Sequence, residues 1–175
     1  MKLQISNLDY SAWATTGQDG VWLGIGFGST VMKGADFIIC EFSFTGTSNI
    51  NNFRCTDRIA TSSSRPFVDS VEDVTTLNTT RVYDEANKLA TLSTTFSRKL
   101  NTLDTNQDFL LTNGQSLSAI WAWGAMSSTT ILNHGSSALK RNTFTMKLNA
   151  LNSWSILCYG TSMLLAMVTF ITMMY

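Results

Sequence analysis

Two residues of this sequence, Met32 and His134, have side chains that can bind a metal together. Met32 stands in a polar loop, GSTVMKGAD, and His134 is the only histidine in the chain, in LNHGSS after an apolar run. One thioether and one imidazole form the axial pair of a six-coordinate, low-spin haem that transfers electrons, and the methionine raises its reduction potential. Spacing alone favours an ordinary interpretation, in which the histidine lies on the surface and the methionine packs.

Other kinds of catalytic site have little support in the residues. A single histidine excludes most histidine-rich metal sites and the ligation of haem by two histidines of one chain. The sequence has no G-x-S-x-G, P-loop or H-E-x-x-H motif. Asp104 and Asp108 could form an acid–base pair, but their TLDTNQD context favours turn residues that accept backbone hydrogen bonds. The 12 basic and 12 acidic residues balance, so no nucleic-acid surface is indicated.

The elements that must position these side chains are strands. The chain has one proline and many Thr, Val, Phe and Trp residues, and turn signals such as GQDG separate its short apolar runs. About nine or ten such runs predict an all-β fold, a β-sandwich. The glycines of GIGFG end one run, and no helix pattern follows them. They favour a tight turn or the close approach of a large group over a dinucleotide loop.

Two further features concern covalent modification. Cys40 and Cys55 lie in neighbouring strand-like runs and fall roughly opposite each other if those runs form a hairpin. The residues leave open whether they form a disulfide or remain two buried thiols. Asn78 begins the tripeptide Asn-Thr-Thr, a sequence that is glycosylated when it lies outside the cytosol.

The C-terminal stretch is apolar and carries no charged residue from Ser153 to Tyr175. Its length matches the roughly 20 residues that cross a bilayer. We therefore divide the 175 residues into a domain at 1–149, a short linker at 150–154 and a hydrophobic segment at 155–175. That segment is expected to be either a transmembrane helix or the signal for a GPI lipid anchor.

The side of the membrane on which the domain lies is left open by the residues. Lys140, Arg141 and Lys147 precede the hydrophobic segment and no basic residue follows it, which favours a cytosolic domain. The N-terminal residues lack the apolar core of a signal peptide. They indicate either a protein that faces the cytosol or a chain that begins downstream of its original N-terminus.

Several motifs, in their order along the chain, resemble the DOMON family. The similarity extends from about Trp22 to Leu148. Its most specific parts are WLGIGFG followed by M-x-G-A-D, which starts at Met32, and F-S-R-x-L-x-T-x-D, which contains Arg98. The W-A-W-G run and the late histidine support them. The chain starts late relative to the family pattern, so one N-terminal sheet edge is expected to be incomplete.

The resemblance implies an immunoglobulin-like β-sandwich and, in the cytochrome members, a b-type haem held without covalent bonds between a methionine and a histidine. Those positions are Met32 and His134 in this sequence. With both axial sites filled, the implied function is the relay of single electrons. Other members of the family lack haem and bind sugars or protein partners, so a haem-free binding module at the cell surface is the alternative.

A haem would need an apolar slot and partners for its propionates. Lys33 or Arg141 could meet the propionates, and Arg98 is expected to pair with Asp104 or another acid as a structural clamp. The apolar residues that lie near the two ligand positions in the sequence are Trp22, Phe27, Val31, Trp121, Trp123 and Met126.

The resemblance also implies a setting for the domain. DOMON domains face the cell exterior or a lumen, which outweighs the count of basic residues, and we expect this one to be anchored to a membrane. The implied redox partner is a transmembrane cytochrome b or a flavin oxidoreductase. A copper hydroxylase is excluded because one histidine cannot build its copper sites.

Overall fold

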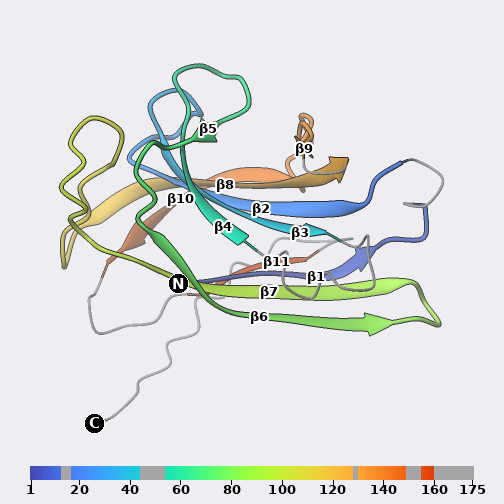
Figure 1. Ribbon diagram of the computed structural model, residues 1–175. Helices are drawn as coiled ribbons and strands as arrows, with labels where there is room; N and C mark the ends of the chain where they lie inside the picture. The colour runs from blue at the N-terminus through green and yellow to red at the C-terminus, as the bar shows by residue number, and fades with distance from the viewer. Residues whose placement is uncertain (13–16, 44–53, 128–129, 149–154, 160–175) are drawn as a thin grey trace, which may run out of the picture.

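The computed structural model describes residues 1–12, 17–43, 54–127, 130–148 and 155–159. All the regular elements in these ranges are β-strands, and they form two sheets (Figure 1). The expected all-β fold is therefore confirmed, and its arrangement is consistent with a β-sandwich. The immunoglobulin-like type of that sandwich stays a prediction.

The first sheet, sheet A, has four strands in the order β11-β1-β7-β6. Their bounds are Ser155–Tyr159 for β11, Lys2–Asp9 for β1, Leu89–Arg98 for β7 and Val74–Asp84 for β6. β1 runs antiparallel to β7 and parallel to β11, which occupies the edge next to β1.

The second sheet, sheet B, has seven strands, six of which follow the order β10-β8-β2-β3-β4-β5. The short strand β9 pairs with β8 off this path. The bounds are Gly20–Phe27 for β2, Asp36–Ser43 for β3, Arg54–Ile59 for β4, Phe67–Val68 for β5, Ser116–Ser127 for β8, Thr130–Ile131 for β9 and Arg141–Lys147 for β10.

The central strand β2 is buried on both of its faces. Side chains alternate across a strand, so Val21, Leu23, Ile25 and Phe27 point into the core between the sheets. Trp22 belongs to a second apolar cluster on the outer face of sheet B, with residues such as Phe37, Ile39, Ile120 and Ile131. A sheet with apolar residues on both faces needs cover on its outer side, and loops supply it.

The two cysteines meet in the structure. Cys40 of β3 and Cys55 of β4 are directly opposite in the register of these strands and are joined by a disulfide. The alternative of two free thiols does not hold. Asn78 is exposed on β6, at the edge of sheet A, so its side chain is accessible; its glycosylation stays a prediction.

The expected hydrophobic segment at 155–175 differs from the structure at its start. Residues Ser155–Tyr159 form β11 and pair with Lys2–Ser6 of β1 instead of beginning a helix. The pairing satisfies backbone groups at the β1 edge that an unpaired strand would expose. The linker at 150–154 and the stretch 160–175 lie outside the described residues. The described part of the chain contains no helix that could span a membrane.

Candidate functional site

A cavity of about 890 Å³ lies on the outer face of sheet B. Its floor is made by side chains of three adjacent strands, β2, β3 and β8. The floor residues are Trp22, Gly24, Phe37, Ile39, Ile120 and Ala122. Three loop segments form the walls, at 30–32, 63–66 and 132–138. In Figure 1, β5 and β9, which adjoin two of these segments, lie on the side of sheet B that faces away from sheet A.

Met32 lies in the wall that connects β2 to β3 and is half-buried. The residues Met32 to Ala35 form a β-turn in which the backbone N–H of Ala35 donates to the Met32 carbonyl at 3.1 Å. Gly34, the third residue of the turn, has a φ of 76°, a conformation that favours glycine. Its N–H donates to Ala60 at 2.8 Å, so the turn is also attached to the end of β4. M-K-G-A is thus a local turn sequence that presents Met32 to the cavity.

His134 lies in another wall segment, between β9 and β10, and lines the same cavity. Its Nδ1 is 2.5 Å from the carbonyl oxygen of Gly135. Because a carbonyl can only accept, this hydrogen bond puts the proton of a neutral ring on Nδ1 and leaves the lone pair on Nε2. The His134 ring meets Trp22 edge to face at 6.2 Å between centroids. The Trp22 Nε1–H donates to the Leu132 carbonyl at 2.9 Å, which attaches this wall to the floor.

The structure brings three of the six apolar residues that the sequence places near the ligand positions into the cavity lining. Trp22, Val31 and Trp121 line the cavity with Met32 and His134. Met126 is buried in the same outer-face cluster as Trp22 but does not line the cavity.

Phe27 and Trp123 are not part of the lining. Phe27 is fully buried between the sheets because it is five positions from Trp22 and so faces the other side of β2. Trp123 packs against the same core, and its Nε1–H donates to the Leu139 carbonyl at 3.0 Å. The expectation that these two rings line a ligand slot is therefore not met by the geometry.

Two arginines, Arg65 and Arg141, line the cavity, whereas none of the described residues that line it is acidic. Lys33, the other cation that the sequence suggests, is outside the lining. Sequence reasoning missed Arg65, which precedes the only proline of the chain in the SSSRPF loop. The polar residues around the two arginines include Ser63, Ser64, Asn133 and Asn142. The cavity thus combines an apolar floor with a cationic and polar rim.

Gly24 has no side chain, so the backbone of β2 is accessible in the middle of the cavity floor. It lies opposite Ile39 on β3 and Ala122 on β8. A Cβ at this position would come within 3.3 Å of the Ile39 side chain and 3.4 Å of the Trp22 ring. The missing side chain lets a flat group approach the backbone of β2, which agrees with the interpretation of the GIGFG glycines as a place of close approach.

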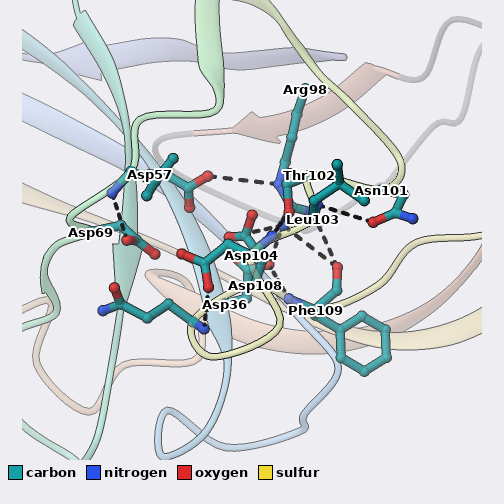
Figure 2. A network of polar contacts seen from close by, with 12 residues as sticks. Asp36, Asp57, Asp69, Arg98, Asn101, Thr102, Leu103, Asp104, Asp108 and Phe109 are labelled. Atoms are coloured by element: carbon teal, nitrogen blue, oxygen red, sulfur yellow. Dashed lines mark hydrogen bonds and ion pairs between the residues drawn. The ribbon is translucent and has the colours of Figure 1, made fainter.

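A second group of polar side chains lies inside one end of the sandwich (Figure 2). Arg98, at the end of β7, is 2.6 Å from Asp36 and 3.1 Å from Asp108 and has Asp57 at 3.7 Å. All four side chains are almost completely buried. We call these residues the Arg98 network. It joins the two sheets, since Arg98 belongs to sheet A and Asp36 and Asp57 belong to sheet B.

The network confirms that Arg98 pairs with acids and changes the role expected of Asp108. Arg98 does pair with acids as a clamp, but Asp104 is not among its ion-pair partners. Asp104 instead accepts the backbone N–H groups of Asn106 and Gln107, as expected of a turn residue. Asp108, which the sequence suggests to be a second turn residue, is drawn into the buried network because its loop folds back over the end of the sandwich.

Burial changes the acidity of two network carboxyls. Burial, together with the neighbouring charges of Asp36 and Asp108, raises the pKa of Asp57 to about 8, and Arg98 opposes the shift. Burial likewise raises the pKa of Asp36 to about 6, against the opposing effect of Arg98 and of the Phe109 backbone N–H. Asp36 begins β3 directly after the Met32 turn. The network therefore fixes the strand end from which the cavity wall starts.

Comparison with known proteins places the chain among recognised domains. The DOMON domain family matches residues 3–124. Among solved structures, the cytochrome b domain of pyranose dehydrogenase from Coprinopsis cinerea is similar, with a TM-score of 0.46 and 15% sequence identity over 74% of this chain. The aligned part spans 62% of the length of that structure. No curated protein matches the chain.

Proposed function

The chain belongs to the DOMON domain family, and from this premise we propose that it binds b-type haem between Met32 and His134 and relays single electrons. The observation that carries the proposal is the position of these two side chains. They come from loops about a hundred residues apart in the sequence, yet they line one cavity. His134 is the only histidine available for such a role.

The shape and chemistry of the cavity fit this group. Its volume of about 890 Å³ is in the range of cofactor sites. The floor offers apolar side chains and the accessible backbone at Gly24 to a flat macrocycle. Arg65 and Arg141 offer guanidinium groups to two propionates, and charge-assisted hydrogen bonds of this kind are among the stronger ones.

The residues of the chain would have separate roles in this site. Met32 would provide a thioether, and the hydrogen bond of His134 to Gly135 orients the imidazole with Nε2 free to ligate. Trp22 and Ile120 would exclude water from the face of the ligand. A haem held by these two residues would supply one-electron chemistry at this site.

A second candidate function is the binding of a carbohydrate in the same cavity without haem. The observation that favours it is the polar rim, where Ser63, Ser64, Asn133 and Asn142 surround a floor that contains Trp22. Aromatic rings beside amide and hydroxyl groups are suited to sugar rings, which have apolar faces and polar edges. Absorption spectroscopy separates the two functions.

We extend the proposal to the setting of the domain. The disulfide between Cys40 and Cys55 supports a location outside the reducing cytosol. The uncharged residues 160–175, which follow β11, have the length of the hydrophobic tail in a lipid-anchor signal and support attachment to a membrane. A transmembrane cytochrome b or a flavin oxidoreductase would then exchange electrons with the haem. The location is tested by expressing the full chain in a host with a secretory pathway and treating it with a glycosidase. A decrease in mass that Asn78→Gln abolishes would show that the domain is glycosylated and therefore lies outside the cytosol.

The test of haem binding is the absorption spectrum of the full chain expressed with added haem. We expect a Soret band and, after reduction, the sharp bands of a low-spin b-type haem. Met32→Leu keeps the side-chain volume but removes the sulfur, and His134→Gln removes the imidazole. Each variant should lose the low-spin spectrum, and Met146→Leu, a buried methionine of β10 away from the cavity, should keep it.

A folded protein without a Soret band would overturn the haem proposal. Binding of a sugar that Asn133→Ala abolishes would then support the second function. A low-spin spectrum that persists in both Met32→Leu and His134→Gln would contradict the assigned ligands.

A further inference from the structure

The carboxylates of Asp36, Asp57 and Asp108 form a compact set of oxygen atoms. One oxygen from each lies within 4.8 Å of the other two. They come from the start of β3, from β4 and from the loop that follows β7. Figure 2 shows them converging on the same space beside Arg98. We propose that this set binds a divalent cation, Ca²⁺, next to Arg98, at a site distinct from the cavity.

The charges of the network do not balance. Three carboxylates carry three negative charges when ionised, and Arg98 is the cationic side chain that the described residues place within ion-pair distance of them. The remaining two negative charges match one divalent cation. Asp69 is also close enough for its charge to act on Asp57, which adds to the excess. An uncompensated buried charge is strongly unfavourable, so the network needs a further positive partner.

The second observation is the set of carboxylate oxygens that lack hydrogen-bond partners. Asp57 is 1% exposed, and neither of its oxygens has such a partner within the described part of the chain. The same is true of both oxygens of Asp108 and of Oδ1 of Asp36. Buried carboxylates are almost always hydrogen-bonded, because the loss of water otherwise goes uncompensated. Arg98 forms ion pairs with Oδ2 of Asp36 and Oδ1 of Asp108. The oxygens of Asp57, Oδ1 of Asp36 and Oδ2 of Asp108 stay available to a ligand.

The donor atoms select the kind of cation. All three side chains offer oxygen, and neither cysteine sulfur nor histidine nitrogen is part of the set. Hard oxygen donors favour Ca²⁺ or Mg²⁺ over zinc or copper. Ca²⁺ binds oxygen at about 2.3–2.6 Å, so two ligands across the ion are up to about 5 Å apart, which covers the observed spacing. Ca²⁺ also accepts the irregular geometry of ligands from two strands and a loop, whereas Mg²⁺ requires a regular octahedron.

Two bound protons are the competing way to neutralise the network. Neutralisation by a cation and neutralisation by protons predict different effects of added Ca²⁺ on the stability of the folded chain at neutral pH. If the carboxyls hold protons, added Ca²⁺ changes nothing. If they hold Ca²⁺, removal of the ion leaves repelling charges inside the sandwich, and the folded state loses stability.

The experiment uses the full chain in mild detergent, stripped with EDTA and returned to a neutral, chelator-free buffer. Addition of about 1 mM Ca²⁺, a concentration at which extracellular Ca²⁺ modules are occupied, should raise the melting temperature by about 3–10 °C. Isothermal titration should give one Ca²⁺ per chain, and Mg²⁺ at the same concentration should give a smaller shift. Terbium luminescence sensitised by tryptophan gives a second measure of binding in the wild-type chain.

Asp57→Asn and Asp108→Asn remove one charge each and should abolish the response to Ca²⁺. The matched control is Asp84→Asn, an exposed carboxylate at the end of β6, which should respond as the wild type does. If a network variant does not fold, the wild-type titration still decides the proposal. The absence of both a melting shift and a titration signal in the wild type would overturn it. An unchanged response in a folded Asp57→Asn chain would overturn it as well.

Discussion

The cavity and the Arg98 network differ in how their side chains are held. Met32 and His134 lie in loops and are half-exposed. Backbone hydrogen bonds of a turn hold the segment of Met32, and one hydrogen bond to the Gly135 carbonyl holds the His134 ring. Arg98, Asp36 and Asp57 lie on strands of both sheets and are almost completely buried. The difference suggests a division of roles. The network should govern whether the domain folds, while the cavity should govern what it binds.

The largest effect is expected from Arg98→Met, which leaves three buried carboxylates without their arginine. Removal of one partner of a buried ion pair lowers the free energy of unfolding by about 3–5 kcal/mol. Urea denaturation followed by tryptophan fluorescence measures the loss. The matched control is Arg54→Met, because Arg54 makes a solvent-exposed ion pair with Glu72 at 3.9 Å. Arg54→Met should lower the free energy of unfolding by less than about 1 kcal/mol. Equal effects of the two substitutions would show that the network does not dominate folding.

The disulfide lies beside the network, since it links β3 and β4, the strands that carry Asp36 and Asp57. The double variant Cys40→Ala/Cys55→Ala should lower the free energy of unfolding by about 3 kcal/mol, the entropic estimate for a closed loop of this size. The loop between the two cysteines spans a separation of 15 residues. Urea denaturation of the wild type with and without reductant provides the control. If reduction destabilises the double variant as much as the wild type, the effect does not come from this bond.

The pH dependence of stability in EDTA tests the network carboxyls directly. The pKa of Asp57 is raised to about 8 and that of Asp36 to about 6, above the ordinary value of 3.8. A raised pKa means that the folded chain binds protons more readily than the unfolded chain. The stability that these protons contribute is present below about pH 4 and is lost as the pH rises through 6 and 8. Between about pH 5.5 and 8.5 we expect a loss on the order of 4 kcal/mol in the free energy of unfolding, most of it from Asp57, which Asp57→Asn should reduce. A free energy of unfolding that rises over this range would contradict the assignment.

The smallest effect on folding and the largest on the ligand are expected from Gly24→Leu. The new side chain would extend over the floor of the cavity, where even a Cβ lies 3.3 Å from Ile39. We expect the Soret band to be lost while the free energy of unfolding falls by about 1–3 kcal/mol, the usual effect of an added buried side chain. Thr75→Leu adds the same side chain at an exposed position of β6 and should keep the Soret band. Loss of folding in Gly24→Leu would show that the cavity floor and the core are not independent.

Much of the local structure was predictable from the sequence. Short apolar runs between turn signals predict strands, because side chains alternate with a period of two. The same rule explains the position of Cys40 opposite Cys55, and the M-K-G-A turn is of a type that requires glycine at its third residue. The motif order also identified the family that the chain matches over residues 3–124.

The errors concern contacts between distant segments. Phe27 and Trp123 are near the proposed ligands in the sequence, but the alternation along their strands turns them toward the core. The prediction that Arg98 pairs with Asp104 or another acid holds, but the sequence did not indicate that the partners would be Asp36 and Asp57, which lie on the other sheet. Proximity in sequence is a poor guide in a sandwich because neighbours in space come mainly from different strands.

The sequence by itself determined the strands, the turn that carries Met32 and the presence of one imidazole, since these depend on local side-chain types and spacing. Only the tertiary structure decided that Met32 and His134 face the same cavity and that Arg65 joins its rim. It also decided that three carboxylates gather around Arg98. The physical reason is that a sheet is defined by its register. Register places residues that are more than a hundred positions apart side by side, and no local pattern indicates which strand will be the neighbour.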